Sequence, residues 1–174
     1  MDDHNIEKEL VKSLNLDRGF YTRLEQLIMS LMHTNERFLK VSKEFFNKFD
    51  ITETQFNALM AIFDHYNSHG LPLNQKELAE KLLINKASAG TLIDRLLKNK
   101  WIRVEPSEED RRAKNVFLTD LGLSKYKKVF EPYYLFMGPL TSNVSEEEVN
   151  KTLETLHKLR LNLSYLESGL SNDL

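Results

Sequence analysis

The sequence of 174 residues contains no cysteine, only four prolines and six glycines, and no long uninterrupted hydrophobic stretch. Without cysteine there can be no disulfide, no cysteine-ligated zinc and no thiol-based redox sensing. Without a run of about 18 apolar residues, we expect no membrane-spanning helix and no membrane partner. The first residues, MDDHNIEKELVKSL, are acidic and polar, unlike a secretory signal peptide. By elimination, the sequence predicts a cytoplasmic protein.

Charge is unevenly distributed along the chain, although the formal net charge is only −2. Residues 74–118 carry ten lysines and arginines against seven aspartates and glutamates, whereas the remainder carries 14 against 19. A basic central segment with acidic flanks is typical of a DNA-binding region held on an acidic frame.

Apolar residues recur at helical spacing over most of the chain. From about residue 17 to residue 49 they predict one helix of roughly 30 residues, long enough to suggest packing against a partner chain. Thr52 with Gln55, and later Asn74 with Glu77, match the capping box that starts a helix. We therefore expect further helices to begin at these two places.

Residues 74–99 predict two short helices joined by a tight turn. Asn74 can cap the first helix and Asn85 the second, and small side chains follow Asn85. The pattern fits a helix-turn-helix, and it fits a plain pair of core helices equally well. The residues expected to face inward are Leu78, Ala79, Leu82, Ala89, Leu92, Ile93 and Leu96.

A hairpin is predicted directly after these two helices. Trp101–Val104 and Val116–Leu118 read as strands on either side of a polar loop that Pro106 introduces. A hairpin that follows a helix-turn-helix is a wing. Its loop contains the adjacent pair Arg111 and Arg112, preceded by acidic residues.

The C-terminal third predicts two more helices. Residues 120–137 are rich in aromatic side chains, and Ser145 with Glu148 forms another capping box. In the last helix the apolar residues have an average spacing of 3.5, which is typical of a coiled-coil seam. We expect this seam to pack on a partner subunit, the alternative being an amphipathic helix that lies on its own domain. The seam residues are Val149, Leu153, Leu156, Leu159, Leu163, Leu166 and Leu170.

The combined pattern resembles the MarR family of winged helix-turn-helix regulators over roughly residues 20–170. The segments that carry the resemblance are ITETQFNALMAI, LNQKELAEKLLINKASAGTLIDRLLKNKWIRV and DRRAKNVFLTDLG. The resemblance implies a mainly α fold with a small β wing. It also implies a winged helix-turn-helix DNA-binding domain at 51–119, between dimerisation helices at 1–50 and 120–174.

The resemblance further implies a function. Family members are dimers that place one recognition helix per subunit in the major groove and one wing in the adjacent minor groove. We therefore expect a homodimeric transcriptional regulator, a repressor, that binds an inverted-repeat operator in double-stranded DNA. Many members lose DNA affinity when a small ligand binds between their two domains, so we expect a small aromatic or phenolic effector. No enzymatic activity and no cofactor is expected.

The sequence departs from the family pattern at three positions. An acid is usual where Ser107 stands, and a neighbouring glutamate is expected to replace it. A glycine is common where Lys100 stands, so we expect Asn99, which tolerates a positive φ, to end the recognition helix instead. An arginine is frequent where Thr91 stands, so base readout at that position must differ.

Two groups of side chains are candidates for DNA contact. Small and hydroxyl-bearing residues on the recognition helix can approach base edges, and its free amides can bind phosphate. At the wing tip, Asp110 can orient Arg112 for a narrow minor groove, the alternative being a solvated surface ion pair. The candidates are Asn85, Lys86, Ala87, Ser88, Gly90, Thr91 and Arg95 on the helix, and Asp110, Arg111, Arg112 and Lys114 on the wing.

Two other functions compete with DNA binding. A winged helix can serve as a protein–protein interaction module. His65 and His69, with Asp64 nearby, could form the site of a metal-responsive regulator, although two such histidines are often simply exposed. No nucleophile elbow, phosphate loop or HExxH motif points to an enzyme. Six aromatic residues could line an effector pocket or belong to the core: Phe20, Tyr21, Phe45, Phe46, Phe63 and Tyr66.

Overall fold

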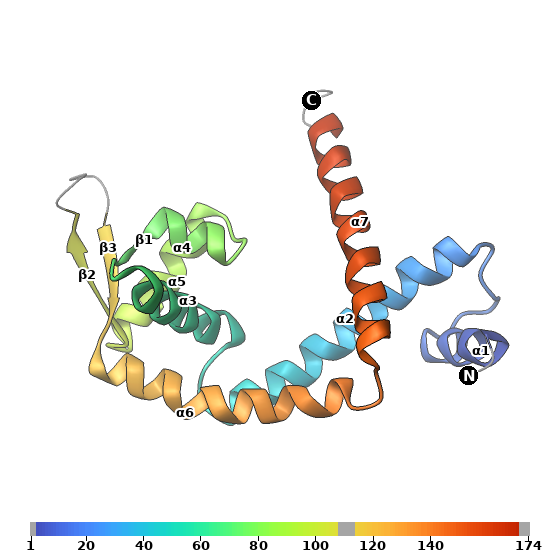
Figure 1. The fold of residues 1–174 in the computed structure, drawn as a ribbon, viewed down its shortest axis with the longest axis horizontal. Coiled ribbons are helices and arrows are strands. Elements are labelled where there is room, and N and C mark those ends of the chain that lie inside the picture. The colour runs from blue at the N-terminus through green and yellow to red at the C-terminus, as the bar shows by residue number, and fades with distance from the viewer. Residues whose placement is uncertain (1–2, 108–113, 171–174) are drawn as a thin grey trace. The chain divides into compact units, whose positions relative to one another are not determined.

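The computed structural model describes residues 3–107 and 114–170 (Figure 1). The chain divides into two compact units, Met1–Phe130 and Glu131–Leu174. In chain order the helices and strands are α1 (Asp3–Ser13), α2 (Arg23–Asn47), α3 (Glu53–His69), β1 (Leu73–Asn74), α4 (Gln75–Lys81), α5 (Lys86–Lys98), β2 (Ile102–Pro106), β3 (Lys114–Leu118), α6 (Asp120–Met137), the 3-10 turn η1 (Gly138–Thr141) and α7 (Glu146–Leu170). The predicted fold, mainly α with a small β wing, is confirmed.

The wing is part of a three-stranded antiparallel sheet with the order β1-β3-β2. β2 and β3 pair along their whole length, from Ile102 opposite Leu118 to Pro106 opposite Lys114. Pro106 therefore ends the strand, whereas the sequence placed it at the entrance of the loop. β1 was not predicted. Its Leu73 pairs with Val116 of β3. A strand of two residues is too short to show the alternation of apolar and polar residues by which a strand is recognised in a sequence.

Side-chain caps set the starts of α3, α4, α5 and α7, as the sequence predicts. Thr52 and Gln55 form both hydrogen bonds of a capping box at α3, of 3.2 and 2.9 Å. Asn74 and Glu77 form the equivalent pair at α4, of 3.0 and 2.8 Å. Each box pairs two backbone amides that the first helical turn would otherwise leave without a partner.

The expected single helix over residues 17–49 is wrong at its start, because α2 begins at Arg23. Thr22 accepts a hydrogen bond of 3.0 Å from the Glu25 amide and so caps the helix there. The Glu25 carboxylate accepts a hydrogen bond of 2.6 Å from the Tyr21 amide and pairs with Arg18. Pairing with Arg18 and this amide bond hold the pKa of Glu25 below its usual value. The apolar spacing continues through residues 17–22, although the backbone of these residues is not helical.

Aromatic side chains from three helices form the centre of the core in the unit Met1–Phe130. The ring of Phe56 lies 5.4 Å from Phe46 of α2 and 6.0 Å from Tyr126 of α6, between ring centroids. Phe46 and Phe56 are almost completely buried. Ser42 is buried on the same side of α2, and its hydroxyl donates a hydrogen bond of 2.8 Å to Glu53. These contacts hold α3, and with it the helices that follow, against α2.

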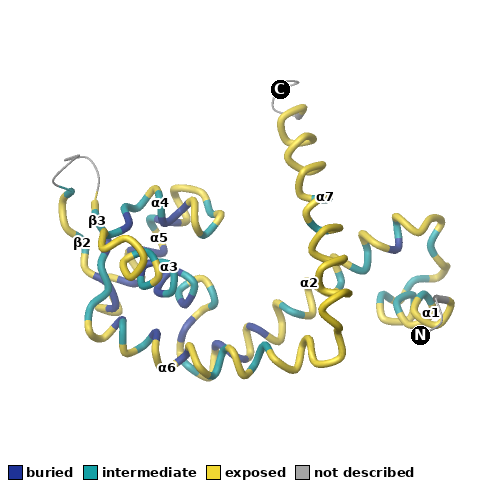
Figure 2. Tube along the Cα trace, in the orientation of Figure 1, coloured by how far each residue is buried: buried dark blue, intermediate teal, exposed yellow. Residues whose placement is uncertain are grey.

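The unit Glu131–Leu174 contains the end of α6, η1 and α7. Ser145 and Glu148 form the predicted capping box at the start of α7, with hydrogen bonds of 2.8 and 3.3 Å. Every described side chain from residue 131 to residue 169 is at least partly exposed (Figure 2). Leu153 and Leu163 are 54% and 57% exposed. Among the described residues of the apolar seam of α7, Val149, Leu153, Leu163 and Leu166 are therefore uncovered in the single chain. Among the described residues, no helix is long and apolar enough to cross a membrane.

Candidate nucleic-acid interface

The recognition helix α5 is built as the sequence predicts. Asn85 caps it, accepting a hydrogen bond of 2.8 Å from the Ser88 amide. The inward-facing residues Ala89, Leu92, Ile93 and Leu96 are buried. Burial of this face fixes the helix on the body of the domain and turns its opposite face outward.

The outward face of α5 carries the seven helix residues proposed for DNA contact. Six of them are exposed: Asn85, Lys86, Ala87, Ser88, Thr91 and Arg95. Gly90 is partly covered, and a Cβ atom added to it would lie 3.5 Å from the Gln75 side chain. Within the chain there is thus room for a larger residue at this position. The Thr91 hydroxyl donates a hydrogen bond of 3.2 Å to the Ala87 carbonyl oxygen.

A groove of about 570 Å³ runs between this face and the start of α3. Thr54 and Gln55 line one side, and Ser88, Thr91 and Arg95 line the other. Sequence reasoning did not include Thr54 and Gln55 among the candidates for DNA contact. The capping box at Thr52 does locate Thr54 and Gln55 in the first turn of α3. The sequence does not show, however, that this turn lies beside α5.

Two residues with positive φ lie at the ends of the paired helices. Leu83, between α4 and α5, has φ 53° and is 93% exposed. Lys100, after α5, has φ 58°, whereas Asn99 has φ −77°. Asn99 does end the helix as its C-cap, as expected, but the left-handed conformation belongs to Lys100 instead. Lys100 takes it at a cost of about 1–2 kcal/mol relative to a right-handed conformation, so the surrounding contacts must impose it.

The wing is described up to residue 107 and again from residue 114. Lys114 is exposed and pairs with Pro106 at the end of the hairpin nearest the loop. Asp110, Arg111 and Arg112 lie outside the described residues. On the strands themselves, the Arg103 guanidinium lies 4.2 Å from the centroid of the Phe117 ring and forms an ion pair with Glu105.

The six aromatic residues considered for an effector pocket have different environments. Phe45 and Phe46 belong to the core, and Tyr21 is 79% exposed beside Arg18. Phe63 and Tyr66 line a pocket between α3, the wing strands and α6. The remaining one, Phe20, lines another pocket, which is formed by the α1–α2 connection and the first turns of α2.

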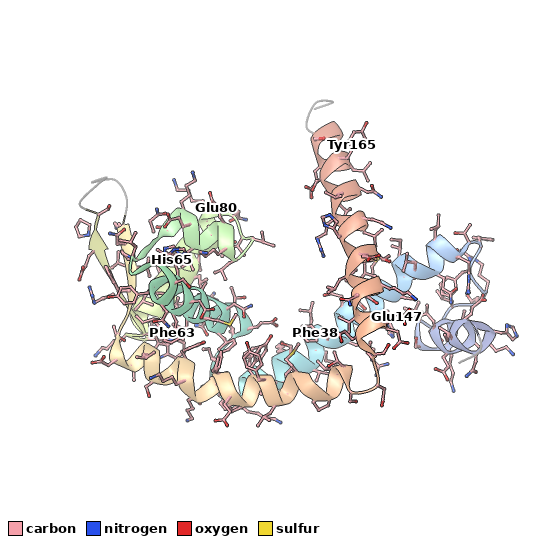
Figure 3. All side chains as sticks on the ribbon, viewed as in Figure 1. Phe38, Phe63, His65, Glu80, Glu147 and Tyr165 are labelled. Carbon is pink, nitrogen blue, oxygen red and sulfur yellow. The ribbon has the colours of Figure 1, made fainter. Side chains whose placement is uncertain are left out.

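The two histidines of α3 are in contact, with ring centroids 4.6 Å apart. His65 lies on the side of α3 that faces α4 (Figure 3). Its Nδ1 atom is buried and has no hydrogen-bond partner within the described part of the chain. Burial, then the nearby His69, lowers the pKa of His65. Over residues 3–107 and 114–170, no three His, Asp or Glu side chains are grouped so that they could hold a metal ion.

Comparison with known proteins gives a consistent family. Residues 51–114 match the model of the MarR family. The HTH-type transcriptional regulator PecS of Dickeya dadantii (strain 3937) is 30% identical over 105 residues, which are 59% of this chain and 61% of PecS. The HTH-type transcriptional repressor YetL of Bacillus subtilis (strain 168) is 25% identical over 150 residues, 86% of both chains.

The fold is also similar to that of solved structures. The chain of a MepR–DNA complex from S. aureus superposes with a TM-score of 0.68 and 22% sequence identity. The match covers 82% of this chain and 97% of the MepR chain. This likeness covers more of the chain than residues 51–114.

Proposed function

We propose that this chain, whose residues 51–114 match the model of the MarR family, is a winged-helix transcriptional regulator of that family and binds an inverted-repeat operator as a homodimer. We further propose that it acts in the cytoplasm as a repressor, and that a small aromatic or phenolic ligand releases it from DNA. The single observation that carries the proposal is the outward face of α5, which is capped and exposes small, hydroxyl-bearing and basic side chains.

That face suits the major groove. Ala87 and Ser88 are small, which lets the start of the helix sit deep between the phosphate backbones, and the unpaired amides of the first turn can bind phosphate. Ser88 and Thr91 can form hydrogen bonds with base edges or phosphates, and Ala87 can touch a thymine methyl group. Lys86 and Arg95 add positive charge to the same face.

The start of α3 extends this surface. Thr54 and Gln55 lie across the groove from Ser88 and Arg95. Their side chains are polar and come from the first turn of a helix, whose positive end favours a phosphate. We propose that this edge binds the DNA backbone beside the recognition helix and thereby fixes the orientation of α5 in the groove.

The wing supplies the second contact. A narrow minor groove concentrates negative potential, and a guanidinium gives up less hydration than an ammonium on entering it. We assign this role to Arg112, with Asp110 two residues before it to orient the guanidinium. We propose that Arg111 and Lys114 contact phosphates.

Assembly into a dimer follows from the flanking helices. We propose that residues 1–50 and 120–174 form the dimerisation region around the DNA-binding domain at 51–119. The uncovered seam of α7 supports this proposal, because long apolar stripes in a small protein usually pack on a second copy. A two-fold dimer then presents its recognition helices to half-sites about 34–36 Å, or 10 base pairs, apart. The similarity to YetL, a transcriptional repressor, supports a role as a repressor.

A salt titration of DNA binding tests the proposal. The purified protein should select an inverted repeat from random duplex DNA. Its affinity for that repeat should fall steeply with salt, because each phosphate contact releases condensed counterions. Binding to DNA with no salt dependence, or no binding at all, would contradict the proposal and favour a protein–protein module. Mapping the bound sites in the genome would then identify the operator and the neighbouring genes.

A further inference from the structure

We propose that His65 and His69, on successive turns of α3, together bind one divalent transition-metal ion of the class that prefers imidazole ligands, which includes Zn²⁺ and Cu²⁺. The two histidines lie within the unit Met1–Phe130. They are distant from the DNA-contact surface proposed above, because Gln55, on that surface, lies about 15 Å before His65 along the helix axis. The inference therefore does not depend on the proposed function.

The spacing of the two histidines suits a shared ion. Residues four positions apart lie on the same face of a helix, one above the other, and the two imidazole rings are in contact with their centroids 4.6 Å apart. A coordinating nitrogen lies about 2.0–2.1 Å from Zn²⁺, so two rings that share one ion at a bond angle of about 90–110° have centroids roughly 4.5–5.2 Å apart. The helix thus already holds the two rings at the separation that one ion requires.

A ring nitrogen at this place lacks a partner. The Nδ1 atom of His65 is buried and forms no hydrogen bond within the described part of the chain. A buried polar atom without a partner destabilises the folded state, and an ion coordinated by Nδ1 would supply the missing interaction. His65 lies on the side of α3 that faces α4, whereas His69 is exposed (Figure 3). An ion can therefore reach the pair from the solvent beside His69.

Charged side chains of α4 act on the same place. Burial and the neighbouring His69 lower the pKa of His65 most, Lys81 lowers it further, and Glu77 opposes them. Both Lys81 and Glu77 are thus close enough for their charges to act on a cation bound to His65. Glu77 favours such a cation and Lys81 disfavours it, so the two effects on binding have opposite signs.

The two histidines are the protein ligands of an exchangeable site. Over residues 3–107 and 114–170, no three His, Asp or Glu side chains are grouped so that they could hold an ion, so water molecules complete the coordination shell. We expect a Kd on the order of 1–100 µM, weaker than that of a structural zinc site with four protein ligands.

A bound ion would hold the last turn of α3 in place. His69 is the last residue of α3, and Gly70 follows it with φ 68°. The Gly70 amide donates a hydrogen bond of 2.8 Å to the Tyr66 carbonyl oxygen, and the chain then continues into β1 and α4. Because the folded helix holds both ligands together and the unfolded chain does not, the ion should raise the Tm and slow the exchange of the Gly70 amide with solvent.

Calorimetric titration with Zn²⁺ tests the site on the full-length protein, prepared without an affinity tag and treated with a chelator. We expect one ion per chain. His65→Gln and His69→Gln should each weaken binding at least about tenfold, since one of two protein ligands is lost. His69 is exposed, so its substitution should leave the fold intact. His157→Gln, an exposed histidine of α7, is the matched control and should bind like the wild type.

A relocated histidine tests the geometry itself. Asn67→His combined with His69→Gln keeps five histidines but places the second one two positions from His65, on another face of the helix. This double variant should bind as weakly as His69→Gln. Lys81→Gln should tighten binding by about two- to fivefold, and Glu77→Gln should weaken it by a similar factor, because each removes one charge near the ion. Glutamine can keep the capping box at α4.

Cu²⁺ provides a second readout, because its electron paramagnetic resonance spectrum should show two nitrogen ligands in the wild type and one in His69→Gln. Unchanged Zn²⁺ affinity in His65→Gln and His69→Gln, or binding restored by Asn67→His, would overturn the site. An equal rise in Tm with Zn²⁺ in the wild type and in His69→Gln would overturn it as well. Operator affinity measured without metal tests the proposed function separately, so failure of one does not imply failure of the other.

Discussion

The hydroxyl of Thr119 donates a hydrogen bond of 2.6 Å to the carbonyl oxygen of Lys100. The same hydroxyl accepts one of 3.0 Å from the Gly122 amide, in the first turn of α6. Lys100 is the residue with positive φ that follows the recognition helix. One short side chain therefore connects the residue that follows α5 to the start of α6.

Thr119→Val keeps the shape of the side chain and removes both hydrogen bonds. We expect the free energy of unfolding to fall by about 1–2 kcal/mol, the usual cost of a lost helix cap. Urea unfolding measures it. Thr91→Val is the matched control, because its hydroxyl bonds only within the exposed face of α5, and it should change stability by less than about 0.5 kcal/mol. Equal effects of the two substitutions would contradict the linking role of Thr119.

Gly122→Ala and Gly90→Ala should have opposite effects on stability. A Cβ atom on Gly122 would lie 1.9 Å from the Trp101 carbonyl oxygen, so the backbone must move, at a cost of about 1–3 kcal/mol or more. On Gly90 the nearest atom would be 3.5 Å away, and alanine should stabilise α5 by up to about 1 kcal/mol. Thermal unfolding of both variants checks this. A more stable Gly90→Ala variant that binds the operator less well would indicate close approach of this residue to DNA.

Arg112→Ala should weaken operator binding by roughly 1–3 kcal/mol while leaving the assembly intact. Asp110→Ala should weaken it less, since the arginine keeps its charge and loses only its orientation. Fluorescence anisotropy with labelled operator measures both. Lys151→Ala, an exposed cation of α7, serves as the control and should bind like the wild type. Wild-type affinity in the Arg112 variant would exclude the minor-groove assignment.

Leu156→Glu combined with Leu163→Glu should dissociate the protein or unfold it, and abolish operator binding. Two carboxylates placed in a buried seam would each cost on the order of several kcal/mol. Light scattering reports the mass of the particle. Thr155→Glu with Asn162→Glu places the same charges one position away on α7 and should remain dimeric. A wild-type monomer at micromolar concentration would rule out the seam as an interface.

Stability should fall below about pH 6.5 because of His65. Burial, together with His69 and Lys81, lowers the pKa of this imidazole in the folded state, against the opposing effect of Glu77. The unfolded chain then binds the proton more readily, so the contribution is complete above the unfolded pKa and is lost as the pH falls toward the folded one. We expect the free energy of unfolding, measured by urea unfolding at several pH values, to change less with pH in His65→Gln than in the wild type. His157→Gln should keep the wild-type slope, and equal slopes in all three proteins would argue against His65.

The features that the sequence could predict are local ones. A cap such as Asn74 with Glu77 needs only residues three positions apart, and the buried face of α5 follows from its own spacing. The start of α2 was missed because the apolar spacing begins upstream of Thr22, the residue that caps the first turn of α2. Lys100, and not Asn99, has the positive φ. It directly precedes Trp101, whose carbonyl group packs closely against Gly122. The approach of these two residues is a tertiary contact, which local spacing does not reveal.

The same distinction holds for the candidate sites. Six of the seven helix positions expected to face outward are exposed, since one helical face determines them all. The pocket that includes Phe63 and Arg103 is assembled from α3, two strands and α6, so no single segment of the sequence contains its pattern. Thr54 was overlooked for the same reason, because it reaches α5 only through the packing of α3.

Asn74 is at once the last residue of β1, opposite Asn115 of β3, and the cap of α4. No spacer residue separates the sheet from the first helix of the pair. A residue inserted between Asn74 and Gln75 would turn α4 by about 100° relative to the sheet, since each residue of an α-helix advances that far. Over evolutionary time, this junction should therefore keep a constant length. Natural insertions and deletions are expected instead in connections such as Ser142–Ser145, where neither strand pairing nor a second helix fixes the spacing.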